Sequence, residues 1–425
     1  MSLLFGAIAD DLTGGLELAG MIRAGGISCD FVSDPSLFDR SSEAEAVVVA
    51  LRTRTAPRSE AVEAFRKAAL CLISCNVRQI FFKYCATFDS TDEGNIGPCA
   101  DLLRDMTQSR QTLFCPSFPE AARRVFQGHL FAGDQLISES PKRHDPLTPM
   151  TDPNLVRVLQ RQTRTHVGLL PQQVVREGLA AMQAWSREQI ERAAPFSIAD
   201  AATPEDLKAI AQLTVDWPLM TGNSSVAAYY PQLWERLGLT KRSADRSSLP
   251  GVPGFGVVLA GSCAERTLRQ LELFAADRPV RFVDVTDGST TAAIVDELVG
   301  WAVPRLAEGP VAIATSATPE VVQGVQAKMG QRGAATRAET ILGQVAVRLR
   351  QSGVRRFLIA GGETSGAVLD HLDVRQLKVG AYQAPGISHA LSMETQASAF
   401  CLKSGKLGPE DMLLPMLDRM AQGEI

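Results

Sequence analysis

Two adjacent acids, Asp10 and Asp11, follow a short apolar run near the start of the chain, in the sequence AIADDLTGG. Carboxylates at the end of a buried strand can hold a polyol, a magnesium ion or a reacting hydroxyl, because they accept hydrogen bonds and carry charge. A plain strand-to-helix turn with Asp11 as the helix cap would use the same residues. The pattern alone leaves both interpretations open.

Two further polar segments follow apolar runs in the first half of the chain. The sequence LRTRT contains Arg52 and Arg54, and an arginine there could bind a carboxylate through two parallel hydrogen bonds. A solvated arginine beside a turn is the simpler alternative. The sequence KYCATFDSTDEGNIGP begins at Lys83 and forms a polar loop suited to a polyhydroxylated ligand, or an ordinary loop. Its candidate side chains after Lys83 are Asp89, Ser90, Thr91 and Asn95.

The second half of the chain has three turns rich in glycine and serine: GSCAER (261–266), AGGETSGA (360–367) and LKSGKLG (402–408). Glycine lets the backbone approach a ligand closely, and a helix N-terminus offers free N–H groups to phosphate. Neither a GxxxxGK[ST] nor a GxGxxG motif occurs. Each segment alone is an ordinary turn, but three in one domain favour an anion site.

Short apolar runs alternate with helical patterns along most of the chain, which predicts an α/β fold with mostly parallel sheets. A Ser/Pro/Gly-rich stretch without apolar periodicity indicates a linker at 241–256, between domains 1–240 and 257–425. The predicted strands are Leu3–Ala9, Ile27–Ser33, Ala46–Leu51, Gln79–Tyr84, Thr112–Cys115, His166–Leu170, Phe196–Ala199, Val257–Ala260, Val311–Ala314 and Phe357–Ala360. Helices are predicted over Ser59–Ser74 and from Thr203 onward.

The polar, Pro-rich segment Ser138–Asp152 reads as a loop. A loop of this length inside a compact domain is more often functional than idle. His129 and His144 flank this part of the chain and are the better functional candidates among the histidines.

The overall composition excludes several classes of protein. The 425 residues contain 43 Lys+Arg and 47 Asp+Glu, a net charge of −4, and no long basic run, which argues against nucleic acid as a partner. No apolar run approaches the roughly 20 residues of a membrane helix, and the N-terminus lacks signal-peptide features. Eight cysteines without a CxxC motif and five histidines without HExxH spacing favour a reduced cytoplasmic protein with no metal site of its own.

The order of AIADDLTGG, KYCATFDSTDEGNIGP, AGGETSGA and LKSGKLG resembles the four-carbon acid sugar kinase family. The resemblance covers nearly the whole chain and implies a sugar-binding N-terminal and a nucleotide-binding C-terminal domain. CPSFPE (115–120), QGHLFAGD (127–134) and RHDPLTPMTDPNLVRVL (143–159) are similar to the 3-oxo-tetronate kinase subgroup. Glu93 stands where erythronate and threonate kinases usually carry arginine, which should change how the substrate is held.

The resemblance also implies roles for individual residues. Asp10 or Asp11 would orient the attacking hydroxyl and accept its proton, while Arg54 and Lys83 would neutralise the substrate carboxylate. The second substrate loop would contribute Asp89, Ser90, Thr91 and Asn95. The ATP contacts would be Ser262, Gly361, Gly362, Glu363, Thr364 and Gly405. The last turn departs from the family's commoner Lys-Ser-Gly-Asn-Phe-Gly at Lys406 and Leu407, but its glycines remain, so we expect ATP binding to survive.

These expectations describe a kinase that uses ATP and Mg²⁺ to phosphorylate the C4 hydroxyl of a 3-oxo-tetronate. Its partners would be a small sugar acid and ATP, with a homodimer as one option that the sequence does not decide. A D-threonate or D-erythronate kinase of the same family is one alternative. A nicotinamide-dependent sugar-acid dehydrogenase is another, opposed by the missing GxGxxG motif with its acid ~20 residues on. A non-enzymatic sugar-acid sensor is the weakest.

Overall fold

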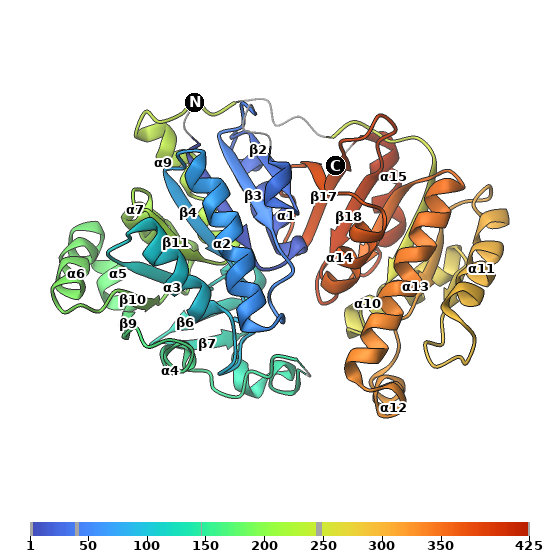
Figure 1. The fold of residues 1–425 in the computed structure, drawn as a ribbon, viewed down its shortest axis with the longest axis horizontal. Coiled ribbons are helices and arrows are strands. Elements are labelled where there is room, and N and C mark those ends of the chain that lie inside the picture. Colours follow the sequence, from blue (N-terminus) through green and yellow to red (C-terminus); the bar gives the residue numbers. More distant parts are fainter. Residues whose placement is uncertain (1–2, 39–41, 146, 244–248, 424–425) are drawn as a thin grey trace. The chain divides into compact units, whose positions relative to one another are not determined.

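The chain divides into two compact units, Met1–Arg246 and Ser247–Ile425, which we call the N-unit and the C-unit (Figure 1). The structure is a computed structural model and describes all residues except 1–2, 39–41, 146, 244–248 and 424–425. The predicted linker at 241–256 therefore lies partly outside the described residues. Each unit is an α/β fold, as the alternation of apolar runs and helical patterns predicts.

The N-unit contains a sheet of parallel strands in the order β2-β3-β1-β4-β11-β5-β10-β9. Its strands are β1 (Phe5–Ala9), β2 (Cys29–Val32), β3 (Ala46–Ala50), β4 (Gln79–Lys83), β5 (Thr112–Cys115), β9 (Val167–Leu170), β10 (Phe196–Ala199) and β11 (Leu219–Gly222). The sequences FGAIA of β1 and AVVVA of β3 are buried throughout, because helices cover both faces of a parallel sheet.

Helices lie on both faces of this sheet. On one face, α2 (Arg58–Ser74), α3 (Ile96–Thr107) and α4 (Leu155–Gln160) pack on a core that includes Phe65, Phe82 and Leu103. The other face is covered by α1 (Leu12–Ala24), α7 (Pro204–Thr214), α8 (Ser224–Ala227) and α9 (Tyr230–Arg236). There Phe5 packs against Trp234 with ring centroids 5.5 Å apart. Helices α5 (Gln172–Glu177) and α6 (Leu179–Glu191) pack against α7.

A small antiparallel sheet interrupts the alternation between β5 and β9. Its strands are β6 (Arg123–Phe126), β7 (His129–Ala132) and β8 (Gln135–Leu136). Two 3₁₀ turns follow at Ile137–Glu139 and Pro141–His144, inside the segment predicted to be a loop. This insertion carries part of the candidate site.

The C-unit contains strands in the order β13-β14-β12-β15-β18-β17-β16. They are β12 (Phe255–Ala260), β13 (Val280–Phe282), β14 (Val311–Ala314), β15 (Val354–Ala360), β16 (Gln376–Val379), β17 (Ile387–Ser392) and β18 (Ala399–Lys403). Strand β17 pairs antiparallel with both of its neighbours, whereas β12, β13, β14, β15 and β18 are parallel. Five parallel strands in succession, β13, β14, β12, β15 and β18, therefore end at one edge.

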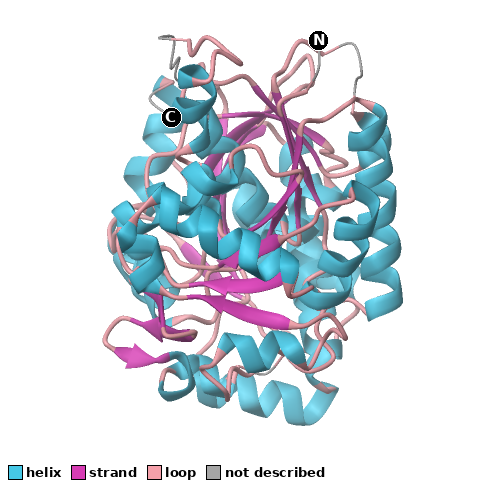
Figure 2. Ribbon diagram, turned by 90° about the vertical axis from the view of Figure 1, so that its left-hand side faces the viewer, coloured by secondary structure: helices cyan, strands magenta, loops and turns pink. Residues whose placement is uncertain are grey.

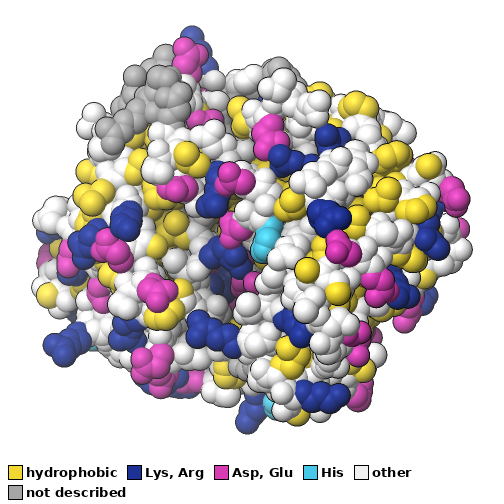
Figure 3. All heavy atoms as spheres, turned by 45° about the vertical axis from the view of Figure 1, so that its right-hand side comes forward, with side chains coloured by type: hydrophobic (Ala, Val, Ile, Leu, Met, Phe, Trp, Pro, Cys, Tyr) yellow, Lys and Arg dark blue, Asp and Glu magenta, His cyan; other side chains and the backbone are white. Residues whose placement is uncertain are grey.

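Helices also cover both faces of the C-unit sheet. On one side, α10 (Glu265–Asp277) and α15 (Leu413–Gln422) pack on a core that includes Leu271, Leu358 and Met416. On the other lie α13 (Gln331–Gln351) and α14 (Gly362–His371), with α11 (Thr291–Ala302) and α12 (Pro319–Met329) packed on α13. Figure 2 shows helices outside the strands, and Figure 3 shows acidic and basic side chains mixed over the face in view. No helix among the described residues is long and apolar enough to cross a membrane.

The predicted elements agree with the structure where apolar runs are continuous. Strands β5, β10 and β14 begin and end at the predicted residues. Thr203 caps α7 through a capping box with Asp206. The prediction missed β6–β8, β11, β13 and β16–β18, which are short or mix polar with apolar residues, as in ISHALS of β17.

Candidate active site

The N-unit sheet reverses its strand order at β1. From β1 the chain passes to β2 and β3 on one side and then to β4 on the other. Ligands of open α/β sheets bind at such a switch point, outside the carboxyl ends of the strands. Asp10 and Asp11 follow β1, Arg54 comes shortly after β3, and Lys83 ends β4. The fold therefore brings together four residues that are far apart in the sequence.

Arg54 binds both aspartates. Its Nε and Nη2 lie 3.0 and 2.8 Å from the two carboxylate oxygens of Asp10, and Nη2 lies 2.7 Å from Oδ1 of Asp11. The backbone N–H groups of Thr53 and Arg54 also donate to the carbonyl of Asp10, which fixes the turn after β3. Asn95 anchors the same turn by donating from Nδ2 to the carbonyls of Thr53 and Ala56, at 2.8 and 2.9 Å.

Lys83 approaches the aspartates from the side of α1. Its Nζ lies 3.6 Å from Oδ1 of Asp11, and its side chain is 4% exposed. A Cβ on Gly14 would lie 1.7 Å from this Nζ, so the glycine of the DDLTGG turn makes room for the ammonium. Among the described residues, no acceptor forms a hydrogen bond with Nζ of Lys83. Donors of this buried ammonium thus remain available to a ligand.

The environment shifts the pKa values of the two aspartates in opposite directions. Burial raises the pKa of Asp10 and outweighs the opposing effect of Arg54. Burial also acts to raise the pKa of Asp11, but the charges of Arg54 and Lys83 prevail and lower it. Adjacent carboxylates with diverging pKa values are a common arrangement in sites that move protons.

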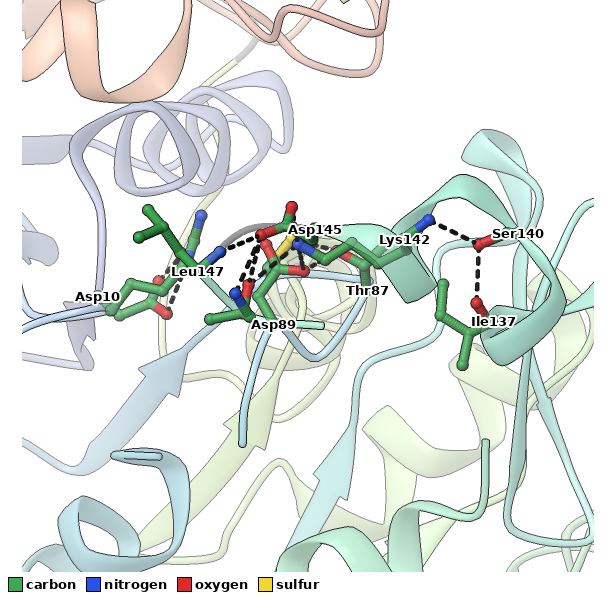
Figure 4. A network of polar contacts seen from close by, with 11 residues as sticks. Asp10, Thr87, Asp89, Ile137, Ser140, Lys142, Asp145 and Leu147 are labelled. Atoms are coloured by element: carbon green, nitrogen blue, oxygen red, sulfur yellow. Dashed lines mark hydrogen bonds and ion pairs between the residues drawn. The ribbon is translucent and has the colours of Figure 1, made fainter. Parts of the chain in front are cut away.

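Asp89 lies in a second network, built around Lys142 of the insertion (Figure 4). Nζ of Lys142 lies 2.8 Å from Asp89, 2.7 Å from Asp145 and 3.1 Å from Oγ1 of Thr148. Burial acts to raise the pKa of Asp89, but Lys142 and then Arg54 outweigh it and hold the pKa at about 2. Asp89 is therefore ionised, and Lys142 fixes its position.

The rest of the second loop is held by Gln162. Its Nε2 donates to Oγ of Ser90 and to the carbonyl of Thr91, at 2.7 and 2.8 Å, and its Oε1 accepts from N–H of Gly97 at 3.0 Å. Oδ1 of Asn95 is buried without a hydrogen-bond donor among the described residues. Ser90, Thr91 and Asn95 thus shape the loop, and their contact with a ligand stays a prediction.

The structure shows the surroundings of three charged residues for which the sequence suggested a role in substrate binding. Arg54 is engaged with the two aspartates, and only its Nη1 has no acceptor among the described residues. Arg52 is exposed. The side chain of Glu93 is 93% exposed and lies 3.8 Å from Arg58. Glu93 is therefore at the surface and is not buried in a substrate pocket. Sequence reasoning missed Lys142 and Gln162, although the Pro-rich segment that carries Lys142 was expected to be functional.

In the C-unit, the three predicted nucleotide turns follow β12, β15 and β18, which are neighbours in the sheet. A Cβ on Gly405 would lie 1.9 Å from Oγ of Ser262, and one on Gly261 would lie 2.1 Å from Oγ1 of Thr364. Gly361 has a φ of 122°, a conformation that favours glycine. The turns therefore converge, and only glycine allows them to approach so closely.

The remaining residues of this edge offer hydrogen-bonding groups. Gly362 and Glu363 are exposed at the start of α14, whereas Thr364 is 6% exposed. After β14, the hydroxyls of Thr315 and Ser316 are buried and have no partner among the described residues. Glycines, unpaired hydroxyls and two helix N-termini are the groups that a nucleotide phosphate chain requires. The edge fits a nucleotide.

A magnesium ion has no side-chain cage of its own in the described part of the chain, where no group of three His, Cys, Asp or Glu side chains could hold a metal. Mg²⁺ often binds through substrate phosphates and only one or two carboxylates. His129 makes hydrogen bonds within the insertion, to Gln127 and Asn154. No histidine among the described residues, His144 included, forms a hydrogen bond or ion pair with Asp10, Asp11 or Asp89.

Comparison with known proteins agrees with this division of the chain. Residues 5–230 match the family model of a sugar-binding N-terminal domain, and residues 257–413 match that of a nucleotide-binding C-terminal domain. A sugar-binding domain joined to a nucleotide-binding domain is the architecture of a sugar kinase. The chain belongs to the four-carbon acid sugar kinase family, and the curated proteins to which it is similar include several 3-oxo-tetronate kinases.

Two of these relatives illustrate the extent of the similarity. The 3-oxo-tetronate kinase of Pseudomonas fluorescens is 43% identical over 99% of this chain and 98% of its own length. That of Burkholderia multivorans is 40% identical over 96% and 95%. Among solved structures, a Salmonella typhimurium protein described as a tRNA synthase has a TM-score of 0.85 at 31% identity, covering 100% of both chains. A Haemophilus influenzae protein has a TM-score of 0.76 at 31% identity, covering 98% of this chain and 100% of its own.

Proposed function

We propose that the protein transfers the γ-phosphoryl group of ATP to the C4 hydroxyl of a 3-oxo-tetronate. The observation that carries the proposal is the cluster of Asp10, Asp11, Arg54 and Lys83 at the switch point of the sugar-binding domain. The cluster combines carboxylates, which can accept a hydrogen bond from a substrate hydroxyl, with cations, which can bind the carboxylate of a sugar acid. The names of the relatives, 3-oxo-tetronate kinases over nearly the full length, support this substrate.

The sugar acid would be held by the cations of the cluster. Lys83 has donors that no described residue uses, and Nη1 of Arg54 has no acceptor there either. Both side chains are largely buried, and a charge-assisted hydrogen bond is stronger away from water. Arg54 would thus hold the aspartates with two nitrogens and contribute the third to the substrate carboxylate.

The attacking hydroxyl would bind Asp11. The side chain of Asp11 is 20% exposed, compared with 8% for Asp10, and its contacts with Arg54 and Lys83 both use Oδ1. The other oxygen of Asp11 therefore has no side-chain donor among the described residues. Asp10, whose pKa is raised, would hold Arg54 in place while the substrate hydroxyl loses its proton.

ATP would bind at the turns of the C-unit, where Ser262, Gly361–Thr364 and Gly405 follow the ends of neighbouring strands. Phosphoryl transfer depends mainly on positioning and on stabilising charge, so backbone N–H groups at these turns are suitable donors to the phosphate oxygens. Mg²⁺, bound with the nucleotide, would neutralise the charge that develops on the phosphate oxygens.

Release of ADP, coupled to an indicator reaction, tests the proposal with Mg-ATP and four acids: a 3-oxo-tetronate, D-erythronate, L-threonate and D-threonate. Turnover confined to the 3-oxo acid is the expected result. Turnover with a plain tetronate alone would keep the kinase and overturn the substrate. Absence of ADP release with every acid, from protein that binds ADP, would overturn the kinase activity itself.

A further inference from the structure

Lys403 is the last residue of β18 and lies directly beneath one of the nucleotide turns. Its side chain is 0% exposed, and no carboxylate lies within 4 Å of its ammonium among the described residues. The other deeply buried lysines differ, since Lys83 pairs with Asp11 and Lys142 pairs with Asp89 and Asp145. Among the described residues, Nζ of Lys403 forms one hydrogen bond, to Oγ1 of Thr267 at 3.2 Å.

The groups near Lys403 add positive charge and no negative charge, which favours the binding of an anion. Thr267 lies in the first turn of α10, whose N-terminus carries partial positive charge. The positive charge of Arg266 lowers the pKa of Lys403, and Arg266 is itself paired with exposed Glu410 at 2.7 Å. Cys401, on the same face of β18, is a thiol whose pKa burial raises to about 12, so it provides no negative charge. Burying an ammonium without a nearby anion is unfavourable, and the described residues supply no counter-ion.

The turn that follows Lys403, at residues 404–406, offers backbone N–H groups that could bind an anion. Oγ1 of Thr267 donates to the carbonyl of Gly405 at 2.8 Å, which completes a chain from the ammonium to the turn. The N–H groups of Gly405 and Lys406 have no acceptor among the described residues, and the same holds for Glu265 and Arg266 at the start of α10. Four backbone N–H groups without an acceptor among the described residues therefore lie in the turn and the helix start that Thr267 connects to Lys403.

We propose that Lys403 is the buried counter-charge for the phosphate groups of the bound nucleotide. It acts through Thr267 and the turn at residues 404–406. The inference rests on the proposed nucleotide site and adds a residue to it. It assigns phosphate, and not the base or the ribose, as the part of the nucleotide that Lys403 stabilises.

The titration of Lys403 gives an independent readout. Burial, with a smaller contribution from Arg266, lowers the pKa of Lys403 to about 8. A phosphate nearby favours the charged lysine, so nucleotide binding must take up protons near pH 8. The affinity for ADP should accordingly fall as the pH rises above about 8.

The first experiment compares ADP and adenosine binding to the full chain by calorimetry, for the wild type and for Lys403→Met. The loss of a charge-assisted interaction should weaken ADP about 10- to 100-fold, while adenosine binding changes less than twofold. Lys378→Met is the matched control, because Lys378 is an exposed lysine of β16 outside the three nucleotide turns, and it should have little effect. Lys403→Arg should recover part of the ADP affinity. Unchanged ADP binding, or equal losses for ADP and adenosine, would overturn the proposal.

A second measurement needs no variant and covers the case in which Lys403→Met does not fold. ADP is titrated into the wild type at pH 8 in two buffers with different enthalpies of ionisation. A net uptake of protons is expected, beyond that of ADP itself, and none would overturn the proposal. ADP binding with these properties but without phosphoryl transfer to any acid would overturn the proposed function and leave the role of Lys403 intact.

Discussion

The N-unit and the C-unit share a local strand pattern but differ in the chemistry at its edge. The order β2-β3-β1-β4 in the N-unit has the same connectivity as β13-β14-β12-β15 in the C-unit. At the N-unit edge, charged side chains such as Arg54 and Asp10 are bound to one another before any ligand arrives. At the C-unit edge, glycines, hydroxyls and free N–H groups predominate, with Lys403 beneath them.

If the two edges bind the sugar acid and the nucleotide, as we propose, one topology serves two kinds of ligand. A small sugar acid requires several directional contacts to hydroxyls and a carboxylate, which paired side chains position in advance. A phosphate chain carries dense charge and is bound well by backbone N–H groups that glycine leaves accessible. The fold decides where a ligand binds, and the residues after each strand decide which ligand it is.

The largest effect should follow from Asp11→Asn, which removes the carboxylate assigned to the acceptor hydroxyl. We expect kcat to fall by about 10²–10⁴-fold, the range for a group that handles the proton in the transition state. Initial rates of ADP release give kcat. Thr203→Ala is a control at the cap of α7, where we expect a stability loss of about 1 kcal/mol and little change in kcat.

The next largest effect tests the C-unit edge. Gly405→Ala would bring a methyl group to within 1.9 Å of Oγ of Ser262 and separate the two turns. We expect KM for ATP to rise by about tenfold or more, with KM for the sugar acid nearly unchanged. Gly300→Ala in α11 is the matched control, because a Cβ there meets nothing within 4 Å. A rise in KM for the sugar acid alone would contradict the separation of the two edges.

Lys142→Met should have a smaller effect, and on the other substrate. Without the ammonium, Asp89 and Asp145 lose their shared partner, so we expect KM for the sugar acid to rise by roughly tenfold and ADP affinity to stay constant. Arg157→Met provides the control, since Arg157 lies near the same insertion and forms an ion pair with Asp152 at the surface. Equal KM values for Lys142→Met and the wild type would leave Lys142 without a positioning role.

The smallest effect concerns acid stability. The pKa of Asp89 is held at about 2, below the value of 3.8 of a free aspartate, so its ion pair stabilises the fold above about pH 4. That contribution decreases as the pH falls from about 4 towards 2. Urea unfolding at pH 7 and pH 3 should show a larger loss for the wild type than for Asp89→Asn. If the wild type and Asp89→Asn lost the same stability between pH 7 and pH 3, the ion pair of Asp89 would not be the source of the loss.

The sequence predicted the parts of both edges that depend on local pattern. The ADDLTGG, GGETSG and KSGKLG segments are strand-to-helix or strand-to-turn junctions, and apolar runs before them locate the strands. It did not predict that Arg54 would bind Asp10 and Asp11, because that contact joins residues 43 and 44 positions apart. It also missed Lys142 and Lys403, whose importance comes from burial.

If the two edges have separate tasks, Asp11→Asn should impair phosphoryl transfer but leave ADP binding intact, because Asp11 lies at the N-unit edge. Calorimetric titration of ADP into the wild type and into this variant, together with their rates of ADP release, gives both quantities. We predict an unchanged dissociation constant for ADP and a rate lowered by orders of magnitude. A variant that keeps its turnover, or one that loses ADP binding, would contradict this separation of tasks.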